Sequence, residues 1–442
     1  METGIITLAL FICMIAGLCI GLPIAFVLGA IGCVFTFFLW GPHAMGVIPN
    51  LIFGKVMSSF GLLAIPLFIL MGAVLQESGM ADRLFSAVHV WAGKVRGGLA
   101  VAALVVCTLF AAMTGIGGAG TVTMGLIALP AMISRGYNKR MALGAVGAGG
   151  ALGILIPPSI IMIIYGMICQ VSVGRLFAGG ILPGLLLVLL FCGYILVRCK
   201  LVPEDGPIEE NAPERSFKEK LIATAPVIPP VALIIVVLGS IFIGVCTATE
   251  GSALGAAGSL LLMVYNRSLN WKTFRAVSLM TLKLTGMVMW IIIGAYCFST
   301  IYMALGADQF IADMITKMPG GYWGVFILIQ VLYFIMGCLL DPGAIVMITA
   351  PLTMPIIEVM GYDPVWFGVI FVMNMQAAYI SPPFGYNLFY LKAIAPPGVV
   401  IRDIYIAIIP FILLQLVGLI ICSIFPQIVL ILPDLIYGVG GG

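Results

Sequence analysis

Charged side chains are scarce in this sequence. Only 8% of its 442 residues are Asp, Glu, Lys or Arg, whereas 62% are hydrophobic. A soluble domain carries roughly 25% charged residues, so this chain has too little polar surface to solvate a water-exposed shell. The scarcity excludes a soluble enzyme, a nucleic-acid-binding protein and a disordered chain. We therefore expect the lipid bilayer to be the main solvent and partner of the chain.

Motifs for phosphate, metal and disulfide chemistry are also missing. There is no G-x-x-x-x-G-K-[ST] motif, so the chain is not expected to hydrolyse ATP by itself. No H-E-x-x-H occurs, and the two histidines, His43 and His89, lie far apart in the sequence. The 11 cysteines are scattered singly without a C-x-x-C pair, which is typical of small buried hydrophobic side chains. We expect no covalent cofactor.

Long and continuous apolar runs dominate the sequence instead. Backbone groups in hydrocarbon must be satisfied internally, which leaves helices or a closed barrel. Runs without alternation predict helices, and at about 20 residues for each spanning helix the chain has room for roughly ten to fourteen passes. The first run, residues 5–20, has no basic flank and no cleavage site, so we expect a retained helix.

Two parts of the sequence match at a fixed offset of 225 residues. The matching pairs are Gly118 with Gly343, Pro130 with Pro355, Gly136-Tyr137 with Gly361-Tyr362, Pro157-Pro158 with Pro382-Pro383, and Tyr165 with Tyr390. Chance matching in a Gly-rich apolar chain is the alternative to a repeat. The connector at 135–140 is basic, whereas its counterpart at 358–363 is acidic. Because Lys and Arg collect on the cytoplasmic side, this contrast predicts an inverted-topology repeat.

A membrane topology with two re-entrant hairpins, at residues 99–133 and 323–357, agrees best with the distribution of charged residues along the sequence. It places 16 of the 20 basic residues on the cytoplasmic side, and Asp308 and Asp313 outside. Treating each hairpin as a full crossing would put like-charged loops on opposite faces.

A Gly-rich segment, residues 115–120, matches G-x-G-x-x-G. A dinucleotide-binding fingerprint needs an acidic residue about 20 positions further on, but no Asp or Glu occurs between Asp82 and Glu204. Two alternatives are left open. The glycines either allow close helix packing or form a hairpin tip whose free carbonyls coordinate a cation.

Two Pro-Pro pairs and one carboxylate fall inside the predicted spans. Pro157-Pro158 and Pro382-Pro383 leave carbonyl groups unpaired, which favours a wet cavity or, alternatively, a simple packing kink. Asp341 is a functional candidate because a carboxylate is costly near the bilayer centre. The alternative is an N-cap of the following helix.

Several sequence blocks resemble the large membrane subunit of TRAP (tripartite ATP-independent periplasmic) transporters. The blocks are Ile154-Leu-Ile-Pro-Pro-Ser-Ile-Ile-Met-Ile-Ile-Tyr165, Leu176-Phe-Ala-Gly-Gly-Ile-Leu-Pro-Gly184, Ile65-Pro-Leu-Phe-Ile-Leu-Met-Gly72, Thr247-Ala-Thr-Glu250 and Ser381-Pro-Pro-Phe-Gly385. The resemblance implies an all-α polytopic protein of the bacterial inner membrane. It also implies sodium-driven, elevator-type import of a small organic anion such as a dicarboxylate, a sugar acid or sialic acid. The implied partners are a periplasmic substrate-binding protein and a small four-helix membrane subunit, which we expect to be a separate chain.

On this resemblance the chain divides into transport and scaffold parts. The expected parts are scaffold helices and an arm in 1–96, a transport-domain half with hairpin 1 in 97–198, a cytoplasmic linker in 199–220, the second scaffold and arm in 221–320, and the second transport-domain half with hairpin 2 in 321–442. The predicted sodium-binding residues are Thr114, Gly115, Gly117, Gly118, Gly153, Pro157, Asp341, Gly343, Ser381 and Pro382. The predicted substrate-binding residues are Thr121, Ser159, Asp341 and Ser381.

Other functions remain as alternatives. A stand-alone sodium–anion symporter would need no binding protein, and an assembly subunit would transport nothing. A membrane-embedded enzyme would need clustered His, Cys or carboxylate side chains at membrane depth, of which the sequence offers almost none.

Overall fold

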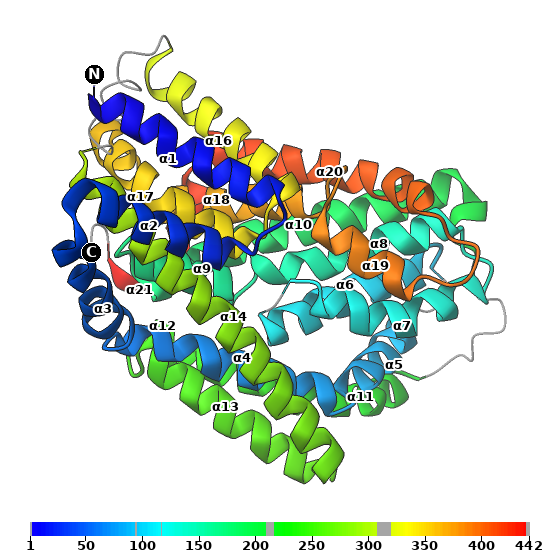
Figure 1. Cartoon of the computed structure of the whole chain (residues 1–442). Coiled ribbons are helices and arrows are strands. Elements are labelled where there is room, and N and C mark those ends of the chain that lie inside the picture. The colour runs from blue at the N-terminus through cyan, green and yellow to red at the C-terminus, as the bar shows by residue number, and fades with distance from the viewer. Residues whose placement is uncertain (1, 93–94, 116, 209–215, 307–319, 439–442) are drawn as a thin grey trace.

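Helices make up the regular structure of the chain (Figure 1). The computed structural model describes residues 2–92, 95–115, 117–208, 216–306 and 320–438, and no strand occurs among them. The predicted all-α fold is therefore confirmed over these ranges. Asp308 and Asp313, which the predicted membrane topology put outside, fall beyond the described residues.

Two series of helices follow one another along the chain. The first series comprises α1 (Glu2–Cys19), α2 (Ile24–Trp40), α3 (Val47–Leu51), α4 (Ala64–Glu77), α5 (Met80–Ala92), α6 (Gly98–Thr114), α7 (Ala119–Ile133), α8 (Lys139–Ala151), α9 (Ile160–Ile168) and α10 (Val173–Leu201). The second series comprises α11 (Phe217–Thr224), α12 (Ile228–Phe242), α13 (Ala248–Tyr265), α14 (Trp271–Ala304), α16 (Gly321–Leu339), α17 (Pro342–Met360), α18 (Pro364–Tyr379), α19 (Tyr386–Ile394), α20 (Ile401–Ile424) and α21 (Gln427–Tyr437).

Six described helical segments are long and apolar enough to cross a membrane. They are Phe60–Glu77, Val173–Leu201, Phe217–Phe242, Trp271–Ala304, Gly321–Leu339 and Ile401–Ile424. This is fewer than the roughly ten to fourteen passes that the apolar content allows at about 20 residues each. The difference arises because several apolar runs are divided into shorter helices, as where the run from 141 to 169 forms α8 and α9.

Both Pro-Pro segments interrupt helices as predicted. The first break begins after α8, and Ser159 caps α9 by accepting a hydrogen bond from the Met162 amide at 3.3 Å. The second break separates α18 from α19. Both Pro–Pro peptide bonds are cis. The backbone therefore leaves its helical path twice within apolar sequence, and each time it resumes as a helix of nine residues.

The helices form two groups by their packing. In one group α14 packs on α2 and α4, and α13 packs on α4 and α12. In the other group α8 packs on α6, α7 and α20, while α18 packs on α16 and α20. The groups meet where α14 contacts α17 and where α4 and α5 contact α6. Figure 1 shows the first group along the lower left edge, with α6, α7 and α8 on the right.

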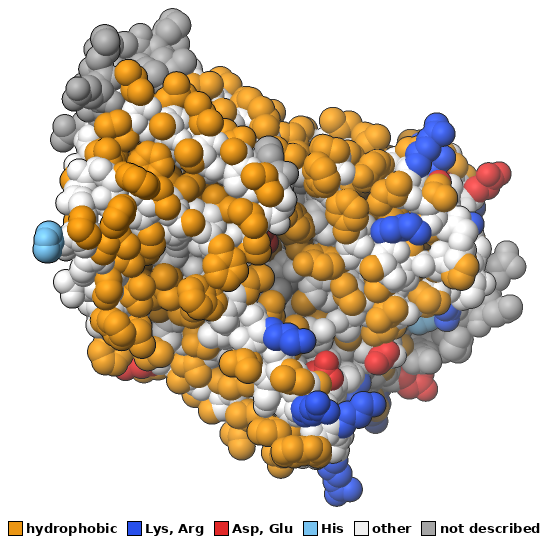
Figure 2. Space-filling model, in the orientation of Figure 1, with side chains coloured by type: hydrophobic (Ala, Val, Ile, Leu, Met, Phe, Trp, Pro, Cys, Tyr) orange, Lys and Arg blue, Asp and Glu red, His pale blue; other side chains and the backbone are white. Residues whose placement is uncertain are grey.

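The surface separates apolar and charged side chains. Figure 2 shows hydrophobic side chains over most of the visible face, with Lys and Arg gathered toward its right and lower ends. Many of the exposed residues on the long helices are large and apolar, such as Leu189 and Leu413. Such a surface is suited to contact with lipid acyl chains.

Candidate functional site

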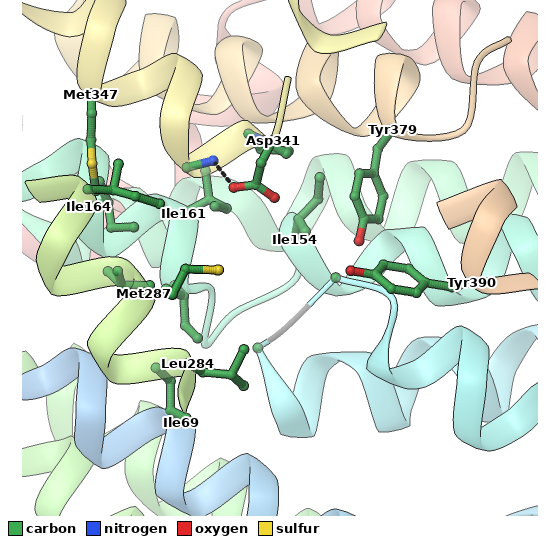
Figure 3. A pocket seen from close by; sticks show the side chains of 17 residues that line it. Ile69, Ile154, Ile161, Ile164, Leu284, Met287, Asp341, Met347, Tyr379 and Tyr390 are labelled. Carbon is green, nitrogen blue, oxygen red and sulfur yellow. Dashed lines mark hydrogen bonds between the residues drawn. The ribbon is translucent and has the colours of Figure 1, made fainter. Parts of the chain in front are cut away.

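A cavity of about 120 Å³ lies inside the bundle, where the two groups of helices meet (Figure 3). Four predicted sodium-site residues line it: Gly115, Gly117, Asp341 and Gly343. Most other lining side chains are aliphatic and come from α9, α14 and α17. Asp341 is the one charged side chain among the described residues that line the cavity. The structure therefore brings together the two turns that are related by the sequence offset.

Asp341 is placed by the start of α17. It is the N-cap of this helix, and its Oδ2 accepts a hydrogen bond from the Gly343 amide at 3.0 Å. The positive end of the helix dipole also stabilises a carboxylate at this position. The N-cap alternative is thus confirmed, and the same side chain faces the cavity in Figure 3. Capping and a role in the cavity are compatible, because the capping bond uses one carboxylate oxygen.

The Gly-rich turn between α6 and α7 packs closely against the first Pro-Pro break and against α19. Gly115 has φ 62°, and a Cβ added to it would lie 2.5 Å from the carbonyl oxygen of Pro158. Gly117 approaches Ile154, and a Cβ on Gly118 would lie 2.5 Å from the Tyr390 ring. Close packing by small residues is therefore confirmed at this turn. The remaining residue of the turn, Ile116, lies outside the described residues.

Two further predicted sodium-site residues pack beside this turn without lining the cavity. A Cβ on Gly153 would lie 2.5 Å from the Ala111 Cβ, so the first break lies directly against α6. The Thr114 hydroxyl donates to the Ala111 carbonyl at 3.1 Å and thereby stays within its own helix. The predicted site residues that are absent from the cavity wall are Thr114, Gly118, Gly153, Pro157, Ser381, Pro382, Thr121 and Ser159.

The three predicted substrate-binding hydroxyls form internal hydrogen bonds. Thr121 is fully buried, and its Oγ1 donates to Asn387 Oδ1 at 2.7 Å. Ser159 donates to the carbonyl of Ile154, and Ser381, just after the end of α18, donates to the Ala377 carbonyl in the last turn of that helix. Direct contact of these groups with a substrate would require these bonds to be exchanged. Their role in substrate binding stays a prediction.

Sequence reasoning missed three polar residues of this region. Tyr379 and Tyr390 line the cavity, and Figure 3 shows both hydroxyl groups close to the Gly-rich turn. Asn387 joins α19 to both α7 and α8, because its Nδ2 also donates to the Gly147 carbonyl at 2.7 Å. Tyr390 matches Tyr165 at the repeat offset, which was a usable signal. Asn387 could have been noticed as an amide within an apolar run.

The geometry defines a class of protein. Interrupted helices and tight turns that meet at a cavity inside an apolar bundle are typical of secondary transporters. The fold itself is similar to that in the crystal structure of the YdaH transporter of Alcanivorax borkumensis. That similarity has a TM-score of 0.65 at 13% identity and covers 92% of this chain and 98% of that one.

Sequence comparison defines the family. Residues 11–428 match the model of the tripartite ATP-independent periplasmic transporter, DctM component, and the chain belongs to this family. It is 36% identical to the C4-dicarboxylate TRAP transporter large permease protein DctM of Pseudomonas aeruginosa, over 90% of this chain and 92% of that protein. The resemblance seen in the sequence blocks is thereby confirmed.

Two other relatives carry different names. The ectoine TRAP transporter large permease protein TeaC of Halomonas elongata is 30% identical, over 96% of this chain and 98% of that protein. The isethionate TRAP transporter permease protein DctMQ of Oleidesulfovibrio alaskensis is 31% identical, over 93% of this chain and 64% of that longer protein. With its family and its long apolar helices, the chain is a multi-pass protein of the bacterial inner membrane.

Proposed function

We propose that this chain is the membrane subunit that moves a small organic anion into the cell, driven by sodium. Its role is transport and not enzymatic catalysis. The relatives named for C4-dicarboxylates and isethionate support an organic anion as the substrate class. The observation that carries the proposal is the Asp341 carboxylate, which is the one charged side chain among the described residues that line the cavity between the two turns.

A sodium ion beside Asp341 would resolve an electrostatic problem. A carboxylate among aliphatic side chains needs a compensating charge, and an anionic substrate next to it would add repulsion. One cation beside Asp341 would offset both charges. We propose a second ion at the Gly-rich turn, supported by the approach of Gly115 to the Pro158 carbonyl. Each sodium ion that moves down a 100 mV potential supplies about 2.3 kcal/mol.

An elevator movement is the proposed way in which the site changes sides. The helix groups support it: α2, α4, α12, α13 and α14 would form the scaffold, and the helices that carry the turns and breaks would move against it. The 225-residue offset supports an inverted repeat, because it also relates the two Pro-Pro breaks. The predicted parts, 1–96 and 221–320 as scaffold, 97–198 and 321–442 as transport domain, and 199–220 as linker, belong to this proposal.

Two protein partners complete the proposed transporter. The family description, tripartite and periplasmic, supports a substrate-binding protein that delivers the anion. The longer relative DctMQ, of which this chain covers 64%, supports a small membrane subunit as the other partner. We propose that this subunit is a separate four-helix chain.

Uptake into proteoliposomes tests this proposal. The chain is reconstituted with a co-encoded small subunit and binding protein, and uptake of a radiolabelled C4-dicarboxylate is measured with an inward sodium or choline gradient. We expect uptake only with sodium and only with the binding protein. Uptake without the binding protein would favour a stand-alone symporter, and no ion-dependent uptake of any tested organic anion would favour an assembly subunit.

A pair of Asp variants tests the site itself. Asp341→Asn should abolish sodium-driven uptake, because it removes the charge from the cavity while the amide oxygen can still cap α17. Asp363→Asn is the matched control: Asp363 caps α18, with Oδ1 accepting from Val365 and Trp366 at 2.8 and 2.9 Å, and it does not line the cavity. Equal uptake by both variants would contradict the site assignment.

A further inference from the structure

A second polar pocket, of about 250 Å³, lies at the basic end of the bundle. The start of α8, the end of α10 and the first turns of α20 form its walls. Arg140, Tyr194 and Arg198 contribute its polar side chains together with Asn138 and Asp205. None of these residues lines the central cavity, so this pocket is separate from the proposed transport site.

The charges in the pocket leave one positive charge uncompensated. Asp205 is buried, and its two carboxylate oxygens accept from Arg198 Nε and Asn138 Nδ2, each at 2.7 Å. Among the described residues, the two terminal nitrogens of Arg198 have no hydrogen-bond partner and are available as donors. The Arg140 guanidinium has no hydrogen bond or ion pair with the part of the chain that the structure describes. The described residues that line the pocket, with two arginines and one engaged carboxylate, thus carry a net charge of +1.

The remaining walls are apolar and continue onto the lipid-facing surface. Phe411 packs edge-on against the Tyr194 ring, with 5.3 Å between the ring centroids, and Pro410 lies beside it in the wall. Outside the pocket, α10 exposes 59% of Val197 and α20 exposes 59% of Leu413. The charged end of the pocket is therefore bordered by two helices with apolar outer faces.

We propose that this pocket binds the phosphate group of an anionic phospholipid. Arg140 and the free nitrogens of Arg198 contact the phosphate oxygens, since guanidinium groups match phosphate geometry with paired hydrogen bonds. The acyl chains lie along the outer faces of α10 and α20. Basic pockets between transmembrane helices are suited to such headgroups, and the adjoining apolar faces favour a lipid over a free phosphate ion.

Lipid binding to the purified chain tests the proposal. Native mass spectrometry counts the molecules of phosphatidylglycerol or phosphatidylcholine that remain bound after titration in detergent. We expect phosphatidylglycerol to bind more tightly, and Arg140→Gln to weaken it about five-fold, because each basic group near an anionic lipid surface contributes roughly this factor. Arg140→Lys keeps the charge and should recover most of the affinity.

The control is Lys200→Gln, which removes an exposed positive charge from the same end of α10 without touching the pocket. It should leave phosphatidylglycerol binding within two-fold of the unmodified chain. Equal binding by Arg140→Gln and Lys200→Gln, or equal binding of the two lipids, would overturn the proposal. Competition by inorganic phosphate at the same concentration as the lipid would also overturn it, since the pocket would then be a site for a free anion.

Discussion

The hydrogen bond between Thr121 and Asn387 indicates that the Thr121 hydroxyl stabilises the fold. The sequence had instead predicted that Thr121 binds substrate, and mutation of Thr121 distinguishes the two roles. Thr121→Val replaces the hydroxyl with a methyl group of similar size, so no cavity forms. The Asn387 Oδ1 then loses its donor in a site where Thr121 is fully buried. An unsatisfied buried group costs about 1–3 kcal/mol, whereas hydrogen bonds between membrane helices contribute only about 0.6 kcal/mol on average. We therefore expect the free energy of unfolding to fall by an amount in the lower part of the first range, about 1–2 kcal/mol.

The assay is reversible unfolding of the purified chain in mixed detergent micelles, followed by circular dichroism. Thr121→Ser retains the hydroxyl group and should lose less stability than Thr121→Val. A double-mutant cycle with Asn387→Leu should give a coupling energy of about 0.5–2 kcal/mol. If Thr121→Val has unchanged stability but a raised KM for uptake, the hydroxyl contacts the substrate and the structural interpretation is refuted.

Two further predictions concern stability and are read out in the same unfolding assay. Gly118→Ala should lower the free energy of unfolding by about 2–4 kcal/mol, because φ is 85° and the added Cβ would lie against the Tyr390 ring. Gly79→Ala, with φ 69° and open space around it, should lower it by only about 1–2 kcal/mol. Equal losses of stability would contradict the close packing at the turn. Asp205→Ala should lower the free energy of unfolding by about 1–3 kcal/mol, because it removes a buried carboxylate that is paired with Arg198 at 2.7 Å. Unchanged stability would show that this ion pair does not stabilise the packing of the linker against α10.

Local sequence signals predicted the interruptions of the helices well. Proline removes a backbone donor and glycine permits left-handed φ values, so the breaks at 157–158 and 382–383 and the turn at 115–118 could be located from the sequence. The capping role of Asp341 was also accessible, because Asp followed by Pro is a common start of a helix. These features depend on neighbours within a few residues.

Features that depend on distant contacts could not be predicted in the same way. Thr121 and Asn387 are separated by 266 positions, and nothing local to either residue indicates that their side chains meet. The hydroxyls of Ser159 and Ser381 were predicted to face a substrate, but each bonds to a nearby carbonyl. Serine side chains at helix ends and in turns often bond to backbone groups close by in the chain, and the sequence does not distinguish this use from substrate binding.

Thermal unfolding of the purified chain gives the most direct test of sodium binding near Asp341. The purified chain is heated in sodium chloride and in matched potassium and choline chloride, with Asp341→Asn and Asp363→Asn alongside. A ligand that binds only the folded chain stabilises it by about 2.7 kcal/mol at 100 times its Kd. We expect a saturable stabilisation that is specific to sodium, lost in Asp341→Asn and retained in Asp363→Asn. The same unfolding curve in all three salts would contradict it.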